Sequence, residues 1–370
     1  MKKLTSLILL LSFCFLFFQP SSAIAAPTTI HIVSPPHQNL SGVFINDDLA
    51  ELILPTGVLG SLVFSPPQGV RTWLIDAELI DEIIAMSTSY TLVTKAAPLG
   101  KDAAISFLET LKQNTFGANV IALAYGNPDV NLARRLAPSE LLGYFTYGKS
   151  QLEKFLGRPV KSQPYGSWSS GRTKLDRKVN QSYTKNRIAL TRLAAVVSSP
   201  EIYALRNHLS ILLSPKLTYE QRSYFSDSAD IATVDMLNKL RIVPGKYQVT
   251  SERVKLPVTL INNFDTAAVV NLQLIPLNSR IQVMDIIEIT LAPKSRTQLE
   301  VPINVIAAGS TKVTAQFSNL HGQPIAEKVY LLLNMNIIDP RITWFTSAAA
   351  ILLFLAAGAQ SIRRIRRSRK

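Results

Sequence analysis

Cysteine and histidine are nearly absent from this sequence of 370 residues, which has one Cys and four His. A single cysteine excludes a disulfide scaffold, and so few Cys and His exclude a structural zinc cluster. His31 and His37 are six positions apart, whereas two imidazoles on one helical face need the spacing i, i+4. His208 and His321 are isolated in the sequence. We therefore expect no metal site.

Common nucleotide-binding and hydrolase motifs are also missing. No G-x-S-x-G, G-x-x-x-x-G-K or G-x-G-x-x-G pattern occurs, so the sequence predicts no cofactor. Charged residues make up only 17% of the chain, and hydrophobic residues make up 47%. This balance is typical of a folded chain and not of a disordered one.

The N-terminus has the pattern of a secretory signal peptide, residues 1–25. Lys2 and Lys3 precede an apolar run over residues 4–18, and Ala23-Ile24-Ala25 provides the small residues that a signal peptidase needs. Cleavage after Ala25 would also remove Cys14, the only cysteine. The alternative is an uncleaved membrane anchor.

The C-terminus has the pattern of a transmembrane helix over residues 342–362. This segment has no Asp, Glu, Lys or Arg, and as a helix it would be about 31 Å long. The tail 363–370 is strongly basic, so the positive-inside rule predicts a single-pass type I protein with a cytoplasmic C-terminus. Anionic lipid headgroups are the expected partners of the tail, through Arg363, Arg364, Arg366 and Arg367.

Much of the excess of basic residues lies at the two ends of the chain, where it belongs to the predicted signal peptide and to the predicted cytoplasmic tail. The formal net charge is +14, but residues 341–370 contribute seven positive charges, and Lys2 and Lys3 contribute two. The exported part, residues 26–340, therefore keeps only +5, and we expect no nucleic-acid partner.

The exported part has two regions of different periodicity. Residues 26–240 alternate short apolar runs at 29–33, 61–64, 72–75 and 119–125 with helical patterns at 76–86, 102–113 and 139–156. This order predicts βαβ units and a mainly parallel sheet, followed by a helical part that includes 190–197, 200–213 and 228–240. Residues 245–336 instead alternate apolar and polar side chains in six or seven short runs separated by turns, as in Val254/Leu256/Val258/Leu260. They predict an all-β, immunoglobulin-like sandwich without a disulfide.

Two acidic residues are the candidates for catalysis. Asp76 follows the predicted strand 72–75, and Asp129 follows the strand that ends near Tyr125. Catalytic groups gather at the carboxyl ends of strands in α/β folds, so the pair could perform glycoside chemistry. The favoured alternative is helix capping, with Asp76 as an N-cap, and with Asn127 as the cap of a helix whose first turn contains Asp129.

The segment 162–192 contains the candidates for ligand binding. Tyr165 and Trp168 lie in a polar loop, where aromatic rings can stack on sugars. A basic strip follows, in which Asp176 is the only acid; it contains Arg172, Lys174, Arg177, Lys178, Lys185, Arg187 and Arg192. Such a strip could bind anionic wall polymers or phospholipid, although a solvated helix face is the favoured explanation.

Two sequence stretches, residues 72–79 and 120–129, carry a resemblance to a known family, as do Leu256-Pro257-Val258-Thr259 and the Arg-rich tail. The chain resembles an actinobacterial family of uncharacterised cell-envelope proteins with a signal peptide, a carbohydrate-deacetylase-like α/β domain, a sandwich and a C-terminal span. The metal-binding pattern of working deacetylases is missing here, so the resemblance implies a degenerate barrel. The family's genetic association with a peptidoglycan precursor flippase implies a link to wall assembly.

These features together predict a degenerate, barrel-like α/β domain with a helical extension, then an immunoglobulin-like sandwich and one transmembrane helix. The leading hypothesis is a non-enzymatic, membrane-anchored envelope protein that binds a cell-wall polysaccharide or an envelope protein. The rival is a membrane-tethered, carbohydrate-active hydrolase, a glycosidase or a deacetylase-like enzyme, that uses Asp76 and Asp129.

Overall fold

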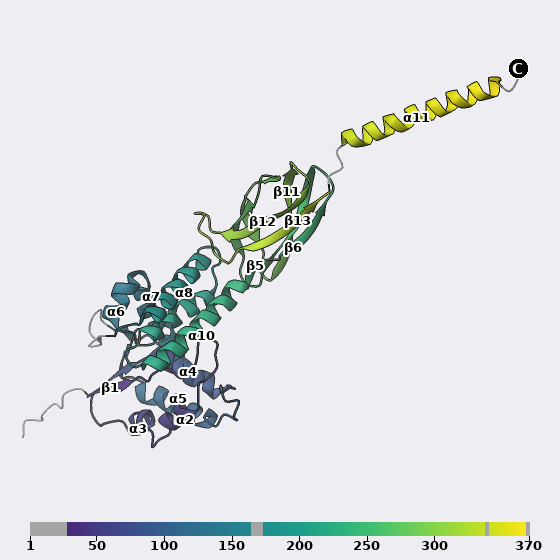
Figure 1. Ribbon diagram of the computed structural model, residues 1–370. Helices are drawn as coiled ribbons and strands as arrows, with labels where there is room; N and C mark the ends of the chain where they lie inside the picture. The colour runs from purple at the N-terminus through teal and green to yellow at the C-terminus, as the bar shows by residue number, and fades with distance from the viewer. Residues whose placement is uncertain (1–27, 164–172, 337–339, 368–370) are drawn as a thin grey trace, which may run out of the picture. The chain divides into compact units, whose positions relative to one another are not determined.

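The computed structural model describes residues 28–163, 173–336 and 340–367, and the chain divides into two compact units (Figure 1). Unit 1 contains the described residues up to Thr173 together with Leu213–Leu217. Unit 2 contains Lys174–Leu212 and the chain from Thr218 onward. The predicted signal peptide, residues 1–25, lies outside the described residues.

A four-stranded parallel sheet forms the centre of unit 1. Its strands follow one another in sequence order: β1 (Thr28–Ile32), β2 (Arg71–Ile75), β3 (Asn119–Ala122) and β4 (Lys161–Ser162). The strands bury their apolar side chains, and Trp73 and Ile75 are fully buried. Sequential parallel strands are the arrangement of half a barrel, but these four form an open sheet, so the predicted barrel-like domain is wrong in this respect.

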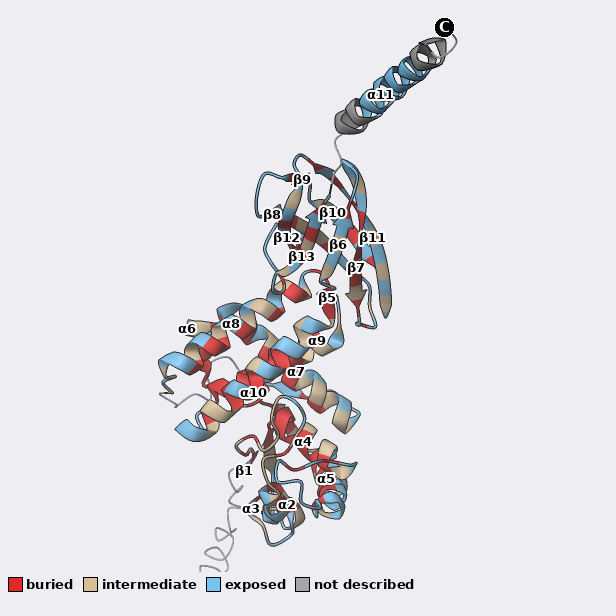
Figure 2. Ribbon diagram, turned by 45° about the vertical axis from the view of Figure 1, so that its right-hand side comes forward, coloured by how far each residue is buried: buried red, intermediate tan, exposed pale blue. Residues whose placement is uncertain are grey.

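Six helices accompany this sheet: α2 (Asp48–Ile53), α3 (Val58–Phe64), α4 (Ala77–Ser87), α5 (Lys101–Thr115), α6 (Val130–Leu136) and α7 (Pro138–Leu156). The helices predicted at 76–86, 102–113 and 139–156 are confirmed as α4, α5 and α7. Each has a buried apolar side, which Figure 2 shows in red for α4 and α7.

The strand predicted at 61–64 is wrong, because these residues lie in α3. A short apolar run fits a strand and a buried helix equally well. Here Gly60 allows α3 to pack against the chain at the end of α2, because a Cβ at this position would lie 1.7 Å from the carbonyl oxygen of Leu54. Only glycine permits the turn that brings α3 so close to the end of α2.

Unit 2 begins with three helices, α8 (Arg177–Ala194), α9 (Pro200–His208) and α10 (Tyr219–Asn238). Asp176 caps α8 by accepting the N–H of Val179 at 2.9 Å. Thr218 and Gln221 form a reciprocal capping box at the start of α10. The helices lie in the same unit as the sheets that follow them, whereas the sequence analysis placed them with the α/β region.

Two sheets form the rest of unit 2, with strand orders β10-β8-β12-β13-β6 and β5-β7-β11-β9. The strands are β5 (Leu240–Ile242), β6 (Gly245–Val249), β7 (Arg253–Asn262), β8 (Ala268–Pro276), β9 (Ile281–Val283), β10 (Ile286–Leu291), β11 (Ser295–Val305), β12 (Gly309–Ser318) and β13 (Val329–Met335). The alternating runs in the sequence correctly predict β7, β8, β9, β11, β12 and β13, and alternate residues of β7 and β12 are buried, whereas β5, β6 and β10 were not predicted.

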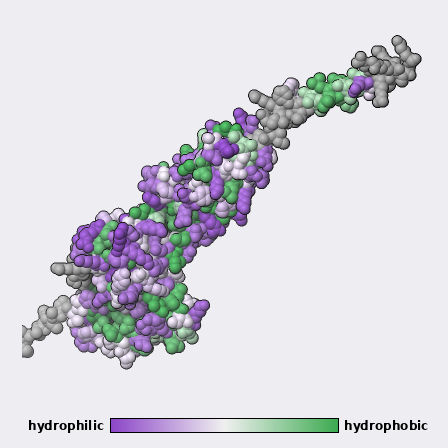
Figure 3. Space-filling view, in the orientation of Figure 1, coloured by the Kyte–Doolittle hydropathy of each residue, from purple (hydrophilic) through white to green (hydrophobic). Residues whose placement is uncertain are grey.

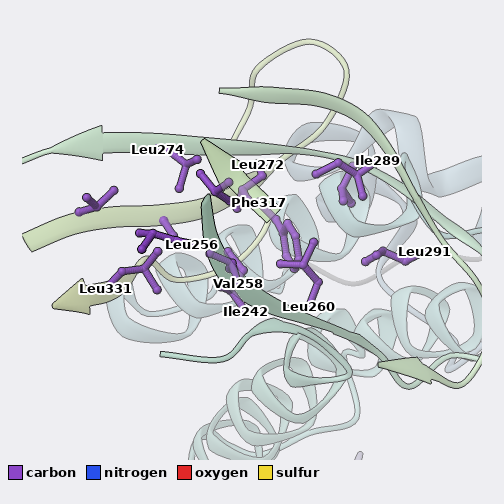
Figure 4. Packing of buried hydrophobic residues seen from close by; sticks show 14 of the residues in the cluster. Ile242, Leu256, Val258, Leu260, Leu272, Leu274, Ile289, Leu291, Phe317 and Leu331 are labelled. Carbon is purple, nitrogen blue, oxygen red and sulfur yellow. The ribbon is translucent and has the colours of Figure 1, made fainter. Parts of the chain in front are cut away.

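One hydrophobic cluster joins the two sheets. Leu256, Val258 and Leu260 of β7 and Leu272 and Phe317 of the other sheet point into the same core, as Figure 4 shows. The immunoglobulin-like label is not supported, since that fold pairs its strands antiparallel whereas β6 joins β13 in parallel.

The last helix, α11 (Pro340–Arg367), carries exposed apolar side chains at Ile351–Leu355, and Figure 3 shows this apolar surface in green. The transmembrane helix predicted at 342–362 is nevertheless a wrong prediction, because no helix in the described ranges is long and apolar enough to cross a membrane. The predicted fold class is therefore wrong. The described residues form a mixture of helices and several β-sheets, with an open parallel sheet in unit 1 and no helix long and apolar enough to span a membrane.

Candidate functional site

The carboxyl ends of β1, β2 and β3 meet at one edge of the parallel sheet in unit 1. Asp76 follows β2 directly and precedes α4, while Gly126 lies in the turn after β3. Ligands gather at such edges in open α/β sheets, so this is where a site is expected. The segment after β1, which contains His37, reaches the same edge through its contact with Glu82 of α4.

The Asp76 carboxylate is held by backbone amides. Its Oδ1 accepts the N–H of Glu78 at 3.1 Å and the N–H of Gly126 at 3.0 Å. The first bond caps α4, and the second ties the turn after β3 to the end of β2. With 1% of its surface exposed, Asp76 acts as the N-cap that the sequence analysis favoured.

Three further acidic side chains lie on α4 at positions 78, 81 and 82, so they share one side of the helix. Glu82 Oε1 accepts the N–H groups of His37 at 2.7 Å and Gln38 at 2.6 Å. The other oxygen of Glu82, Oε2, is buried and has no hydrogen-bond partner within the described residues. Glu78 lies one helical turn before Glu82, and because two ionised carboxylates repel each other, this spacing favours the protonated form of one of them.

Asp81 is the least buried acid of this group. Tyr125, which follows β3, donates its hydroxyl hydrogen to Asp81 Oδ2 at 3.0 Å. The Tyr125 ring packs edge-on against Tyr147 of α7, with 4.8 Å between the ring centroids. The contact links the residue after β3 to the outer part of α4.

Burial dominates the electrostatics of this carboxyl cluster, which consists of Asp76, Glu78, Asp81 and Glu82. It raises the pKa of Asp81 to about 6, of Asp76 to about 7 and of Glu82 to about 8. The pKa of Glu78 is raised well above its ordinary value by burial and by the neighbouring Glu82. Burial also lowers the pKa of His37 to about 4, so this imidazole is neutral at pH 7.

Raised carboxyl pKa values accompany acid–base catalysis in many enzymes, but catalysis also needs access to a substrate. Glu78 and Glu82 are 5% and 2% exposed. Glu82 Oε1 accepts the amides of His37 and Gln38, and Asp76 Oδ1 accepts the amide of Gly126, so the cluster joins α4 to the segments after β1 and β3. The arrangement is suited to holding the sheet edge together.

Asp129 is bound to a different set of amides. Its Oδ1 accepts the N–H groups of Asn131 and Leu132 at 3.0 and 3.1 Å, and its Oδ2 accepts the N–H of Thr173 at 3.0 Å. Asp129 is thus itself the N-cap of α6, which corrects the prediction that Asn127 is the cap. Asp76 and Asp129 share no hydrogen-bond partner, and both are buried.

The binding candidates of the sequence are only partly described. Tyr165, Trp168 and Arg172 lie outside the described residues. Lys174 and Arg177 are exposed at the beginning of α8. Lys178 is also exposed, and its Nζ pairs with Asp227 Oδ1 at 2.9 Å.

A group of three or more His, Cys, Asp and Glu side chains suited to a metal ion is not found among the residues that the structure describes. The carboxyl cluster itself was missed by the sequence analysis apart from Asp76. Its signal was the spacing of Glu78, Asp81 and Glu82 on a helix that starts at the carboxyl end of a strand.

Comparison with protein families gives one match. Residues 149–370 match a family described as "Family of unknown function (DUF6049)". The matched segment contains α8 to α11 and both sheets of unit 2, and it includes neither Asp76 nor Asp129. A search of curated proteins finds no match.

Several solved structures match about a quarter of the chain. WR4, a member of the C. elegans MSP family, has 9% identity and a TM-score of 0.21, with 26% of this chain and 98% of that chain covered. A Salmonella alpha-2-macroglobulin mutant has 19% identity and a TM-score of 0.21, with 26% and 7% covered. A Clostridium thermocellum cohesin–dockerin complex has 9% identity and a TM-score of 0.18, with 26% and 94% covered.

Proposed function

The chain belongs to the DUF6049 family, whose function is unknown, and from its own residues we propose that it is a non-enzymatic binding or scaffold module that works outside the cytoplasm. The observation that carries this proposal is the state of the two candidate catalytic acids. Asp76 and Asp129 are 1% and 2% exposed, and the oxygens of both are engaged as helix N-caps. A glycosidase needs two carboxyl groups on either side of a bound sugar.

The location and the partner are part of the same proposal. The signal-peptide pattern of residues 1–25 supports export, and the resemblance to cell-envelope proteins supports a wall polysaccharide or an envelope protein as partner. The basic residues Arg363, Arg364, Arg366 and Arg367 would lie beside anionic lipid headgroups.

Co-sedimentation with purified peptidoglycan that retains its anionic polymers tests this function. The purified full chain is mixed with the insoluble wall, and both the bound fraction and the release of reducing sugars or acetate are measured. We expect binding without release. Asp76→Asn and Asp129→Asn should reduce thermal stability, and at temperatures where they stay folded they should bind as the parent chain does.

Asp102→Asn is the matched control, since Asp102 is an exposed acid in the first turn of α5 that caps nothing. Release of sugar or acetate by the parent chain, lost in folded Asp76→Asn or Asp129→Asn but kept in the control, would establish the hydrolase instead. Absence of co-sedimentation at low salt would refute the polysaccharide partner.

A further inference from the structure

A cavity of about 500 Å³ lies within unit 2, inside the segment that matches the family. Residues of α8 and α10 form one wall, and β5, β12 and the chain before β13 form the other. A volume of this size is in the range that accommodates a small organic ligand.

The inner surface of this cavity is apolar. Leu240, Ile242, Phe317 and Ile325 line it, and each has at most 4% of its surface exposed. They also belong to the core cluster shared by the two sheets, so the floor is continuous with the hydrophobic core. Such a floor favours the apolar part of a ligand over water.

The rim of the cavity is basic. Lys185 and Arg192 of α8 line it together with Arg241 and Lys328, and Glu327 is the one acid among the lining residues. Lys185 and Arg192 are seven positions apart and therefore share a side of the helix. Within the described residues, none of these four basic side chains forms an ion pair with a carboxylate.

Hydrogen bonds fix the direction of the two guanidinium groups. Arg192 Nη1 donates to the carbonyl oxygen of Pro324 at 3.4 Å, and Arg241 Nη1 donates to that of Asn238 at 3.3 Å. Each uses one N–H in this way, and a guanidinium has five. The remaining donors can bind the oxygens of a phosphate or a carboxylate.

A polar group in the wall also has an unused hydrogen-bonding capacity. Thr233 lines the cavity and is 2% exposed, and its Oγ1 has no hydrogen-bond partner within the described residues. Its neighbour Asn186 is fixed, because its Nδ2 donates to Asp230 Oδ1 at 2.9 Å. A buried hydroxyl without a partner is unfavourable, so Thr233 makes this part of the wall polar without contributing a hydrogen bond to the fold.

We propose that this cavity, formed by Lys185, Arg192, Arg241 and Lys328 over the apolar floor of Leu240 and Phe317, binds an amphiphilic anion. Such a ligand has a phosphate or carboxylate group joined to an apolar body. The anionic group lies at the rim, and the apolar body fills the cavity. The inference rests on the proposed binding function and names the ligand class of unit 2.

Isothermal titration of the full chain with octyl phosphate, below its micelle concentration, tests the inference. Inorganic phosphate, octanol and octyltrimethylammonium are titrated in parallel. We expect octyl phosphate to bind at least tenfold more tightly than any of the three, since only it combines the two parts. Equal binding of octanol would mean that the rim charges contribute nothing, and equal binding of inorganic phosphate would mean that the apolar floor contributes nothing; either result overturns the proposal.

Charge-neutralising variants locate the site. Lys185→Gln combined with Lys328→Gln should weaken octyl phosphate binding about tenfold, because two rim charges are lost. Arg253→Gln combined with Arg296→Gln removes the same charge from exposed positions on β7 and β11 that do not line the cavity, and should change affinity less than twofold. All four side chains are exposed, so both variants should fold. Equal losses in the two variants, or no loss in the first, contradict the site.

Failure of this inference is distinguishable from failure of the proposed function. Co-sedimentation with the wall without binding of octyl phosphate refutes the cavity ligand and leaves the binding function intact. Binding of octyl phosphate that is lost in the Lys185/Lys328 variant, without co-sedimentation, supports the cavity ligand and refutes the polysaccharide partner.

Discussion

The two units differ in the polar groups that they bury. Among the described residues, the buried carboxyl groups all lie in unit 1, at Asp76, Glu78, Glu82, Asp129 and Glu140. In the part of the chain that the structure describes, unit 2 buries mainly neutral groups, with Arg222 as the charged exception, and its lysines other than the half-buried Lys239 are exposed. Buried acids that bind backbone amides stabilise a fold, whereas exposed charges around a cavity remain available to a ligand.

The largest loss of stability is expected from a substitution in the apolar core of unit 2. Leu260→Ala removes a fully buried side chain between the two sheets and should lower the free energy of unfolding by about 3 kcal/mol. Urea unfolding measures this loss of stability. Hydrogen exchange should show reduced amide protection in peptides of unit 2. Ile275→Ala is the control, because Ile275 is 62% exposed on β8, and it should have little effect. An equal loss of protection in unit 1 would mean that the units do not unfold separately.

Loss of a cap should be the largest single effect in unit 1. Asp129→Ala leaves the N–H groups of Asn131, Leu132 and Thr173 without their acceptor, and should cost about 2 kcal/mol. Thermal unfolding of this variant is compared with that of Asp102→Ala, which caps nothing and should change stability by less than about 0.5 kcal/mol. Similar melting temperatures for the two variants would rule out a structural role for Asp129.

The carboxyl cluster should make the stability of the chain depend on pH, and replacing Glu82 should reduce that dependence. Glu82→Gln keeps an acceptor for His37 and Gln38 but cannot ionise. Burial raises the pKa of folded Glu82 to about 8, whereas the unfolded side chain ionises near its ordinary value of 4.5, so the parent chain loses stability as the pH rises from about 4.5 to about 8. The variant cannot ionise, so its stability relative to the parent should increase between pH 5 and pH 8.5. Urea unfolding at both pH values measures the difference in free energy of unfolding between the variant and the parent. A variant that is less stable than the parent at pH 8.5 would contradict the prediction.

The smallest effect is expected at the cavity wall. Thr233→Val removes a buried hydroxyl that has no partner and should change stability by less than about 1 kcal/mol, in the favourable direction. The same substitution should change octyl phosphate affinity less than twofold, since the phosphate lies at the rim and the hydroxyl is buried in the wall. Thermal unfolding and titration of one sample measure both. A clear loss of stability would show that the hydroxyl has a partner in the folded chain.

The sequence predicts the elements of both units well where side-chain periodicity is long. Alternate apolar residues identify β7 and β12, and the apolar side of residues 76–86 identifies α4, because burial on one side imposes a period. The run 61–64 is too short for this, and the contact of Gly60 with Leu54 that decides its structure comes from the tertiary fold.

The sites were less predictable for the same reason. Asp76 could be identified as a cap from its position alone, but the cap of α6 is shifted to Asp129 since Asn127 adopts a left-handed conformation, with a φ of 42°. The cavity joins Lys185 to Lys328 across a long stretch of sequence, and no local pattern contains that pairing. Folding alone brings these residues together.

Hydrogen exchange of the full chain at pH 6.5 and pH 8.5 tests most directly whether the buried acids support unit 1. Folded-state pKa values of about 7 and 8 for Asp76 and Glu82 lie above their unfolded values, so their stabilising effect is lost as the pH rises to about 8. His37, whose pKa is lowered to about 4, acts in the opposite direction only below about pH 6.5. After correction for intrinsic exchange rates, α4 should lose protection at pH 8.5 while β7 and β11 keep theirs. Unchanged protection of α4, or an equal loss in β7 and β11, would contradict this account.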